Sequence, residues 1–332
     1  MTYGADLSTA DNDTAGLRVA DAELTAQLLP FDALVDAVSV AAIELEAGLI
    51  QSPERMVLPI GTGGTLLCMP ATANDIVTHK LVTVQPANFN LRLPTIHGTL
   101  TVCAAMTGKP LLLLDGSVVT GRRTAAVSML AVKALLGRDP ASVMLIGTGV
   151  QARHHVEALQ ALYPRSHTWV KGSSSARSHA FVDAMRHRHD RLSPAPTAIP
   201  EDVEVVLTVT TSAEPVYDEP PIPGRIVIGV GAFKREMAEI GRKTLACGEI
   251  YADDPAGARS EAGDLIRAGI DWHDVRSLGW LLQHKPHRGN SAVFKSVGTA
   301  AWDLAAGRVA LKNLRNECVP DQRAWLQVGR FV

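Results

Sequence analysis

The chain has 332 residues, of which 46% are hydrophobic and 20% are charged, and its formal net charge is −2 at pH 7. This composition is typical of a globular protein that buries a core, and the length suits one large or two ordinary domains. A net charge so close to zero gives no electrostatic reason to expect binding to nucleic acid or to an anionic membrane. The sequence also lacks an apolar run approaching the roughly 18 residues of a membrane span.

The cysteines and the N-terminus favour a reduced, cytoplasmic protein. The four cysteines stand at positions 68, 103, 247 and 318, far apart and without metal-binding spacing. The first residues, MTYGADLSTADNDTAGL, do not run from basic to apolar to small side chains as a secretory signal does. We therefore expect a polar, frayed leader there.

The first part of the chain, residues 18–125, mixes short helices and strands. A helical period runs from Phe31 to Leu49 and closes at Gly48. Strands are expected at Met56–Leu58, Thr65–Met69, Thr78–Val84, Gly98–Ala105 and Pro110–Leu114. The stretch Thr107–Pro110 has the composition of a hairpin turn between the last two strands.

From Thr124 the pattern changes to alternating helices and strands, which predicts a parallel, doubly wound sheet. The expected helices are Thr124–Leu136, Ala152–Leu162, Ala176–Arg186 and Ala258–Ala268. The expected strands are Val143–Ile146, Thr168–Val170, Val203–Val209, Arg225–Val230 and Glu249–Ala252. A final helical stretch, Gly298–Asn313, is expected to return to the first part of the chain.

The most informative motif lies within ASVMLIGTGVQARHHVEALQALY (141–163). A short apolar strand leads into Gly147-Thr148-Gly149, then Ala152 and a helix, with the G-x-G-x-x-A spacing of a dinucleotide-binding turn. Gly147 permits the turn, Gly149 lets the backbone approach a pyrophosphate, and Ala152 lets the helix sit close to the strand. The helix N-terminus offers free N–H groups to the anion.

The following strand indicates which dinucleotide is bound. An NAD-preferring site carries Asp or Glu near the end of this strand to hold the ribose hydroxyls. Here the strand ends in Lys171-Gly172-Ser173-Ser174-Ser175, and Arg177 follows. Two cations and three hydroxyls suit a 2′-phosphate, which favours NADPH, with NADH as a weaker substitute. The alternative is a solvated Ser-rich loop.

Several motifs together resemble the ornithine cyclodeaminase/μ-crystallin family over nearly the whole chain from about Leu17. They are SPERMVLP (52–59), MPATANDIVTHKLV (69–82), LPTIHG (93–98), TGRRTAAVS (120–128), GTGVQA (147–152), DDPAGARSEAGDL (253–265) and FKSVG (294–298). Within the family, the chain looks most similar to the bacterial Δ1-pyrroline-2-carboxylate reductases.

The resemblance implies a two-domain α/β architecture and a homodimer. A Rossmann-type, doubly wound nucleotide-binding domain is expected over residues 124–298. An α+β substrate-binding and dimerisation domain is expected over residues 1–123, with residues 299–332 returning to it. The nicotinamide would face a pocket built from this domain.

The resemblance also assigns three cations to the reaction site. Lys80, among apolar strand residues, stands at the position of the family's catalytic lysine, and we expect it to give a proton to an imine nitrogen. Burial and neighbouring arginines would lower its pKa. Arg55 and Arg123 match positions that contact substrate or cofactor, and a guanidinium fork suits a carboxylate. A surface ion pair is the alternative for a lone arginine.

Further cofactor contacts follow from motif matches alone. They are Thr95, Thr124, Val150, Gln151, Thr210 and Ser296.

Two departures from the cyclodeaminase pattern bear on the reaction. Cyclodeaminases carry an Asp about six residues before a family Glu, and counting back from Glu239 gives Phe233 here. They also carry a Glu shortly before Met-Pro, where this chain has Leu67. Both acids engage a distal amine, so their loss favours a cyclic imino acid over ornithine.

The sequence thus predicts an NADPH-dependent reductase of Δ1-pyrroline-2-carboxylate and of its six-membered homologue, Δ1-piperideine-2-carboxylate. The alternatives are an ornithine cyclodeaminase that uses NAD, and a μ-crystallin-like protein that only binds NADPH or a ligand. No metal site is expected, because His154-His155 and Arg186-His187-Arg188-His189 lack further ligands and look like solvated helix residues. Asp253-Asp254 is interpreted as a helix-start and turn feature.

Overall fold

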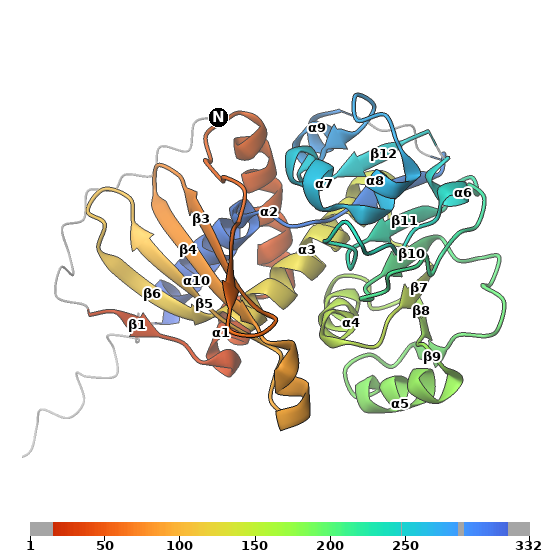
Figure 1. The fold of residues 1–332 in the computed structure, drawn as a ribbon, viewed down its shortest axis with the longest axis horizontal. Helices are drawn as coiled ribbons and strands as arrows, with labels where there is room; N and C mark the ends of the chain where they lie inside the picture. The colour runs from red at the N-terminus through yellow and green to blue at the C-terminus, as the bar shows by residue number, and fades with distance from the viewer. Residues whose placement is uncertain (1–15, 247, 285–288, 318–332) are drawn as a thin grey trace, which may run out of the picture.

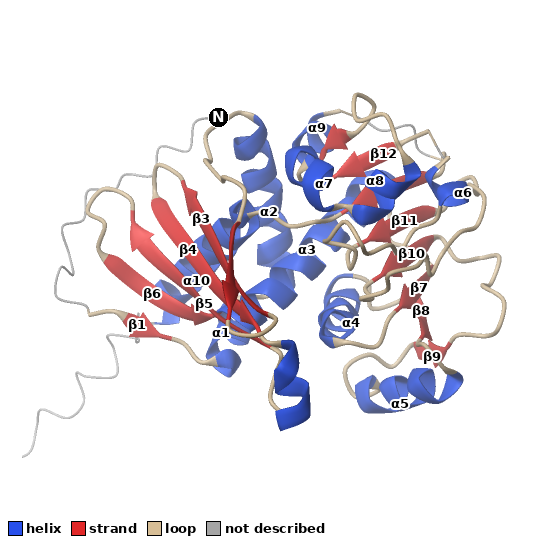
Figure 2. Ribbon diagram, viewed as in Figure 1, coloured by secondary structure: helices blue, strands red, loops and turns tan. Residues whose placement is uncertain are grey.

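The computed structural model describes residues 16–246, 248–284 and 289–317. The predicted polar leader lies, up to residue 15, outside the described residues, as do residues 318–332. The chain folds around two sheets, one of six strands and one of eight (Figure 1). Helices α2 and α3 lie between the first sheet and the second (Figure 2).

The first sheet has the strand order β1-β6-β5-β4-β3-β2. Its neighbours are antiparallel except for β1 and β6, which run parallel. The strands are β1 (Arg18–Val19), β2 (Met56–Ile60), β3 (Gly64–Thr72), β4 (Ile76–Val84), β5 (Ile96–Ala104) and β6 (Pro110–Asp115). The 3-10 turn η1 (Pro86–Leu91) lies between β4 and β5.

Four helices belong with this sheet: α1 (Ala22–Leu28), α2 (Phe31–Glu46), α3 (Gly116–Leu136) and α10 (Ala300–Glu317). The last of them arrives from the far end of the chain and packs on α2 and on β3, β4 and β5. The predicted return of the final helix to the first part of the chain is therefore confirmed.

Alternation along β4 decides which side chains face α10. Ile76, Thr78, Lys80 and Val82 are buried, whereas His79 is exposed on the other face. A strand turns successive side chains to opposite faces, so the buried set shares one face. Lys80 pairs in register with Met69 on β3 and Leu100 on β5, so its strand is an inner one, and its side chain is buried on the face that α10 covers.

The second sheet is parallel throughout, in the order β13-β12-β14-β11-β10-β7-β8-β9. Its strands are β7 (Ser142–Ile146), β8 (His167–Lys171), β9 (Leu192–Pro194), β10 (Val205–Thr208), β11 (Ile226–Gly229), β12 (Ile250–Ala252), β13 (Arg276–Ser277) and β14 (Ala292–Lys295). The helices are α4 (Val150–Leu162), α5 (Ser175–Met185), α6 (Arg242–Leu245), α7 (Pro255–Glu261), α8 (Gly263–Ala268) and α9 (Leu278–Gln283). The predicted doubly wound sheet is confirmed, and its central strands are fully buried, as parallel strands covered on both faces should be.

Two predicted helix boundaries are wrong. Helix α3 begins at Gly116 rather than Thr124, because the Asp115 carboxylate caps it by accepting a hydrogen bond from Val118 N at 2.8 Å. The helix expected over Ala258–Ala268 is two helices, interrupted at Ala262. Loop carbonyls pack so closely on Gly263 that a Cβ there would lie 2.2 Å from Met237 O.

The interpretation of His155 and His189 as solvated is also wrong. His155 is fully buried, with Nε2 2.9 Å from Ser128 Oγ and Nδ1 2.8 Å from the Gln151 carbonyl. Burial lowers the pKa of His155 to about 4, so the ring is a neutral link between α3 and α4. His189 is buried as well, while Arg186, His187 and Arg188 are exposed.

Within the described part of the chain, no helix combines the length and the apolar character needed to cross a membrane.

Candidate active site

A cleft of about 670 Å³ opens at the carboxyl ends of strands β7, β8 and β10. In the sheet order, β8 lies on one side of β7 and β10 on the other. The cleft thus lies where the winding of the sheet reverses, which is where doubly wound sheets bind their ligands.

The glycine turn after β7 forms one wall of this cleft. Gly147 has φ +128°, which favours glycine, and a Cβ there would lie 2.8 Å from the carbonyl oxygen of Val209. Gly149 is the N-cap of α4, and no side chain accepts a hydrogen bond from the backbone amides at this N-terminus of the helix. The first amides of α4 are therefore available to an anion.

Cations line the opposite wall of the cleft. Lys171 ends β8, and Ser173 and Arg177 follow it in the loop and the first turn of α5. Among the residues that line the cleft there is neither Asp nor Glu. The structure brings together six of the predicted cofactor residues here: Gly147, Gly149, Lys171, Ser173, Arg177 and Thr210.

The other five predicted cofactor residues do not line this cleft. Val150 and Gln151 continue from the turn into α4, and the Val150 side chain is exposed. Thr124 is buried within α3, and Thr95 precedes β5. Ser296 lies outside the cleft, and its hydroxyl donates a hydrogen bond to Asp253 Oδ2 at 2.8 Å.

Glu239 shapes the far side of the cleft. Its buried carboxylate accepts hydrogen bonds from Thr208 Oγ1 at 3.0 Å and from the backbone amides of Thr210 and Gly231. The loops that follow β10 and β11 are thereby tied to one side chain, which holds Thr210 at the cleft.

A second cluster of charged groups is buried beside the first sheet. Lys80 Nζ lies 2.9 Å from Asp303 Oδ1 and 2.8 Å from Oδ2, and Arg123 Nε lies 3.3 Å from Oδ1. The three residues come from β4, α10 and the middle of α3, and all are buried. Arg123 was expected to open its helix, and the early start of α3 places it in the third turn instead.

The cluster lies at the same edge of the second sheet as the cleft. Gly298 follows β14 closely, and a Cβ on it would lie only 2.7 Å from Arg123 Nη1. Gly298 also has φ +81°. Because Gly298 has no side chain, the Arg123 guanidinium can lie against its Cα at the carboxyl end of the sheet.

Burial gives Lys80 an unusual protonation behaviour. Desolvation, together with the positive charges of Arg123 and Arg55, lowers the pKa of its ammonium from 10.5 to about 8, against the opposing attraction and hydrogen bond of Asp303. The predicted lowering of this pKa is confirmed. A lysine with a pKa near 8 can donate a proton at physiological pH.

Arg55 is held differently from Arg123. Its Nη2 donates to the carbonyl oxygens of Val297 at 3.0 Å and Gly298 at 2.7 Å, and its Nε lies 2.9 Å from Glu261 Oε1. Arg55 therefore ties the start of β2 to α7 and to the segment that leaves β14. Burial raises the pKa of Glu261 against the attraction of Arg55.

The helix start expected at Asp253-Asp254 is confirmed at Asp254, which supplies the N-cap of α7, while Asp253 has a different role. The Asp253 carboxylate is buried and accepts hydrogen bonds from a set of side-chain and backbone donors on the segment after β14. These donors are Ser296 Oγ, Val297 N, Gly298 N and Trp302 Nε1, at distances of 2.8–3.2 Å.

A model of the ornithine cyclodeaminase/mu-crystallin family matches residues 18–317. The chain belongs to this family. The predicted membership is therefore confirmed.

Relatives and solved structures agree with this membership. The chain is 49% identical over 293 residues to the Δ1-pyrroline-2-carboxylate/Δ1-piperideine-2-carboxylate reductase of Azospirillum brasilense, a match covering 88% of this chain and 94% of that protein. An archaeal alanine dehydrogenase dimer with bound NAD is similar with a TM-score of 0.81 and 25% identity, covering 91% of this chain and 97% of the other. The Thermococcus litoralis Δ1-pyrroline-2-carboxylate reductase, in complex with NADH and L-proline, has a TM-score of 0.81 and 22% identity, with coverages of 90% and 98%. At 22% identity, the similarity to the Thermococcus litoralis structure is evidence for the fold alone.

This member of the family departs from the cyclodeaminase pattern at two apolar positions. Leu67 lies on β3, paired with Val82. Phe233 lies in the loop after β11 and is 39% exposed. Neither side chain offers a counter-charge to a distal ammonium.

The sequence reasoning missed Asp303. The available signal was a carboxylate within the alanine-rich stretch Ala300–Ala306, a part of α10 that the structure buries completely. Acidic side chains are rarely buried without a partner, so this Asp required a cation.

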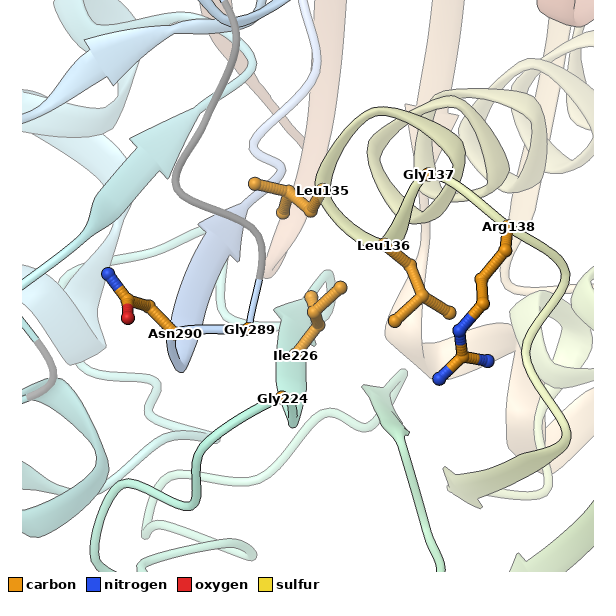
Figure 3. A pocket seen from close by; sticks show the side chains of 8 residues that line it. All are labelled: Leu135, Leu136, Gly137, Arg138, Gly224, Ile226, Gly289 and Asn290. Carbon is orange, nitrogen blue, oxygen red and sulfur yellow. The ribbon is translucent and has the colours of Figure 1, made fainter.

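A further cavity, of about 390 Å³, lies at the amino end of the second sheet, beside the C-terminus of α3 (Figure 3). Leu136 and Ile226 face one another across it, and Arg138 stands at its margin. Arg138 is paired with Glu204, and ligands of such sheets bind at the opposite edge. The candidate active site therefore consists of the cleft at the glycine turn and the cluster of Lys80, Arg123 and Asp303. The described residues contain no cluster of His, Cys, Asp or Glu that could hold a metal ion.

The space beside Gly298 yields a test. We expect Gly298→Ala to lower kcat/KM for the cyclic imine roughly a hundred-fold, because the new methyl group displaces Arg123. Gly269→Ala is the control, since Gly269 has φ +71° with open space around its Cβ position. Both variants should lose about 1–2 kcal/mol of stability from the backbone conformation. Equal activities of the two variants would contradict the assigned contact.

Proposed function

We propose that this protein reduces Δ1-pyrroline-2-carboxylate, and also Δ1-piperideine-2-carboxylate, to L-proline and L-pipecolate with NADPH. The observation that carries the proposal is the buried Lys80 ammonium, set beside Arg123 at the same sheet edge as a dinucleotide-type cleft. The names of the reductases that are nearly half identical over most of the chain support the same reaction.

The residues of the cleft fit a nicotinamide dinucleotide. The close approach at Gly147 and the uncapped start of α4 suit a pyrophosphate. When bound, such a cofactor supplies the hydride that the imine carbon gains.

The chain itself has two tasks in this reaction. The first is to hold the substrate carboxylate, for which Arg123 and Arg55 are the candidates. Lys80, Arg123 and Asp303 together carry one surplus positive charge, which one carboxylate would neutralise. The second task is to give the ring nitrogen a proton, which Lys80 Nζ can do while its ammonium is charged.

Replacing the lysine tests the reaction directly. Lys80→Ala should lower kcat for imine reduction by roughly 10²- to 10⁴-fold, because it removes the proton donor. NADPH binding, followed by the fluorescence of the bound cofactor, should be nearly unchanged. Lys312→Ala, at an exposed position of α10, is the control and should behave like the wild type.

The wild-type enzyme also decides between the reductase and a cyclodeaminase. Phe233 and Leu67 leave the distal ammonium of ornithine without a counter-charge, and an unpaired ammonium in a buried site costs several kcal/mol. Turnover of L-ornithine should therefore be roughly a thousand-fold slower than imine reduction. Ammonia released from L-ornithine with NAD at the rate of imine reduction would refute the reductase. Absence of both reactions would favour a protein that only binds NADPH.

The cofactor preference rests on Lys171, Ser173 and Arg177. A charge-assisted contact to a phosphate contributes about 1.5–3 kcal/mol, so two cations imply at least a ten-fold preference for NADPH over NADH. Lys171→Asp should raise KM for NADPH and leave KM for NADH unchanged or lower. Lys312→Asp controls for the change in net charge, and equal kcat/KM values for both cofactors in the wild type would reject the preference.

We further propose that the protein is a cytoplasmic homodimer. Residues 1–123 and 299–332 would form the substrate-binding and dimerisation domain, and residues 124–298 the nucleotide-binding domain. Free Cys68 and Cys103 suit a reducing compartment.

On the outer face of the first sheet, Met56, Leu58 and Leu81 are 59%, 45% and 36% exposed. Such side chains favour a protein interface.

The mass in solution tests the dimer. Light scattering at micromolar concentration should give twice the mass of the chain, and Leu81→Lys should shift the population towards the monomer. Val40→Lys, at a 52% exposed position of α2, is the control. A wild-type monomer would refute the proposal.

A further inference from the structure

Asp303 is a fully buried carboxylate whose partners are two buried cations. Its oxygens lie 2.8 and 2.9 Å from Lys80 Nζ, and Oδ1 is 3.3 Å from Arg123 Nε. No backbone amide within the described ranges donates a hydrogen bond to it, in contrast to Asp253, which accepts from three. Asp303 is thus placed to act on these two side chains rather than to hold the backbone.

Helix and strand periodicity bring Asp303 to Lys80. Gly307 lies four residues after Asp303 and thus on the same helix face, and its Cβ position is 3.2 Å from Thr78 on β4. Thr78 and Lys80 share the buried face of that strand. The small residue at 307 lets α10 approach the sheet closely, so that the short Asp303 side chain reaches the lysine one turn earlier.

The charges around Lys80 make its protonation depend on the contact with Asp303. Arg123 comes from α3 and Arg55 from the start of β2, and both repel the ammonium, while burial removes its water. Asp303 from α10 is the group whose charge and hydrogen bond oppose these effects. Without it, two cations would stand beside a desolvated lysine that could shed its charge as a neutral amine.

We propose that Asp303 is the positioning residue that holds the Lys80 ammonium in place and in its charged form for proton donation. This inference rests on the proposed reductase function. Asp303 does not itself give or take a proton: it aims Nζ and stabilises the ammonium until the ring nitrogen accepts the proton. It also leaves the cluster with a single surplus positive charge, which suits a substrate with one carboxylate.

A pH profile distinguishes this role from a purely structural one. In the wild type, kcat/KM for Δ1-pyrroline-2-carboxylate with NADPH should fall as the pH rises through about 8, because Lys80 loses its proton. Asp303→Asn removes the negative charge and keeps the shape, so this descending limb should move about one to three pH units lower. The maximal kcat should fall, while the affinity for NADPH, measured in the absence of the imine, should not change.

The chain offers a matched control. Lys295 and Asp264 form another buried lysine–aspartate pair, 3.1 Å apart, between β14 and α8. Asp264→Asn should lower the thermal stability and leave the descending limb where the wild type has it. An Asp303→Asn variant that retains the wild-type limb would overturn the inference.

If Asp303→Asn does not fold, a conservative variant can be used to test the inference. Asp303→Glu keeps the charge and displaces it by one methylene group, so the limb should stay near the wild-type pH while kcat falls. Full wild-type kcat in this variant would overturn the positioning role. If the wild-type enzyme does not reduce the imine, the proposed function fails and the inference fails with it. An active wild type with an unmoved limb in Asp303→Asn defeats the inference alone.

Discussion

The architecture of the site depends on how one carboxylate, Asp253, holds the chain where it leaves the second sheet. Four donors between Ser296 and Trp302 converge on it. Satisfied in this way, a buried carboxylate is well stabilised, and its removal would leave several backbone donors unpaired. These hydrogen bonds hold the segment after β14 in place, and α10, which follows it, packs on the first sheet.

That conformation explains why the cluster of Lys80, Arg123 and Asp303 forms between distant parts of the chain. The carbonyls of Val297 and Gly298 are turned towards Arg55, and the bare Cα of Gly298 makes room for Arg123. One turn into α10, Asp303 meets Lys80. Removing one partner of a buried ion pair typically costs about 3–5 kcal/mol, so the Lys80–Asp303 pair also stabilises the packing of α10 on the first sheet.

Local signals in the sequence were enough for most of the longer elements and for the glycine turn, but not for short elements such as α1, α6, α9 and β9. Val143–Ile146 is short, apolar and followed by glycines, so strand, turn and helix could be predicted within a few residues of their positions. The role of Asp303 could not be predicted, because its partner Lys80 is 223 residues away and only the packing of α10 brings them together. His155 was misjudged for the same reason, since its burial depends on α3 rather than on its own helix.

The two groups of cations in this protein work under different physical conditions. Arg177 is exposed and Lys171 half-buried, so water and salt screen their attraction for an anion in the cleft. Lys80 and Arg123 are buried, and screening there is weak, but burial makes the charge of the lysine depend on pH. A cofactor that must bind and leave suits the screened cations, because their contacts are easily exchanged with solvent. A proton donor needs the opposite setting, in which a neighbouring carboxylate rather than water decides whether it is charged.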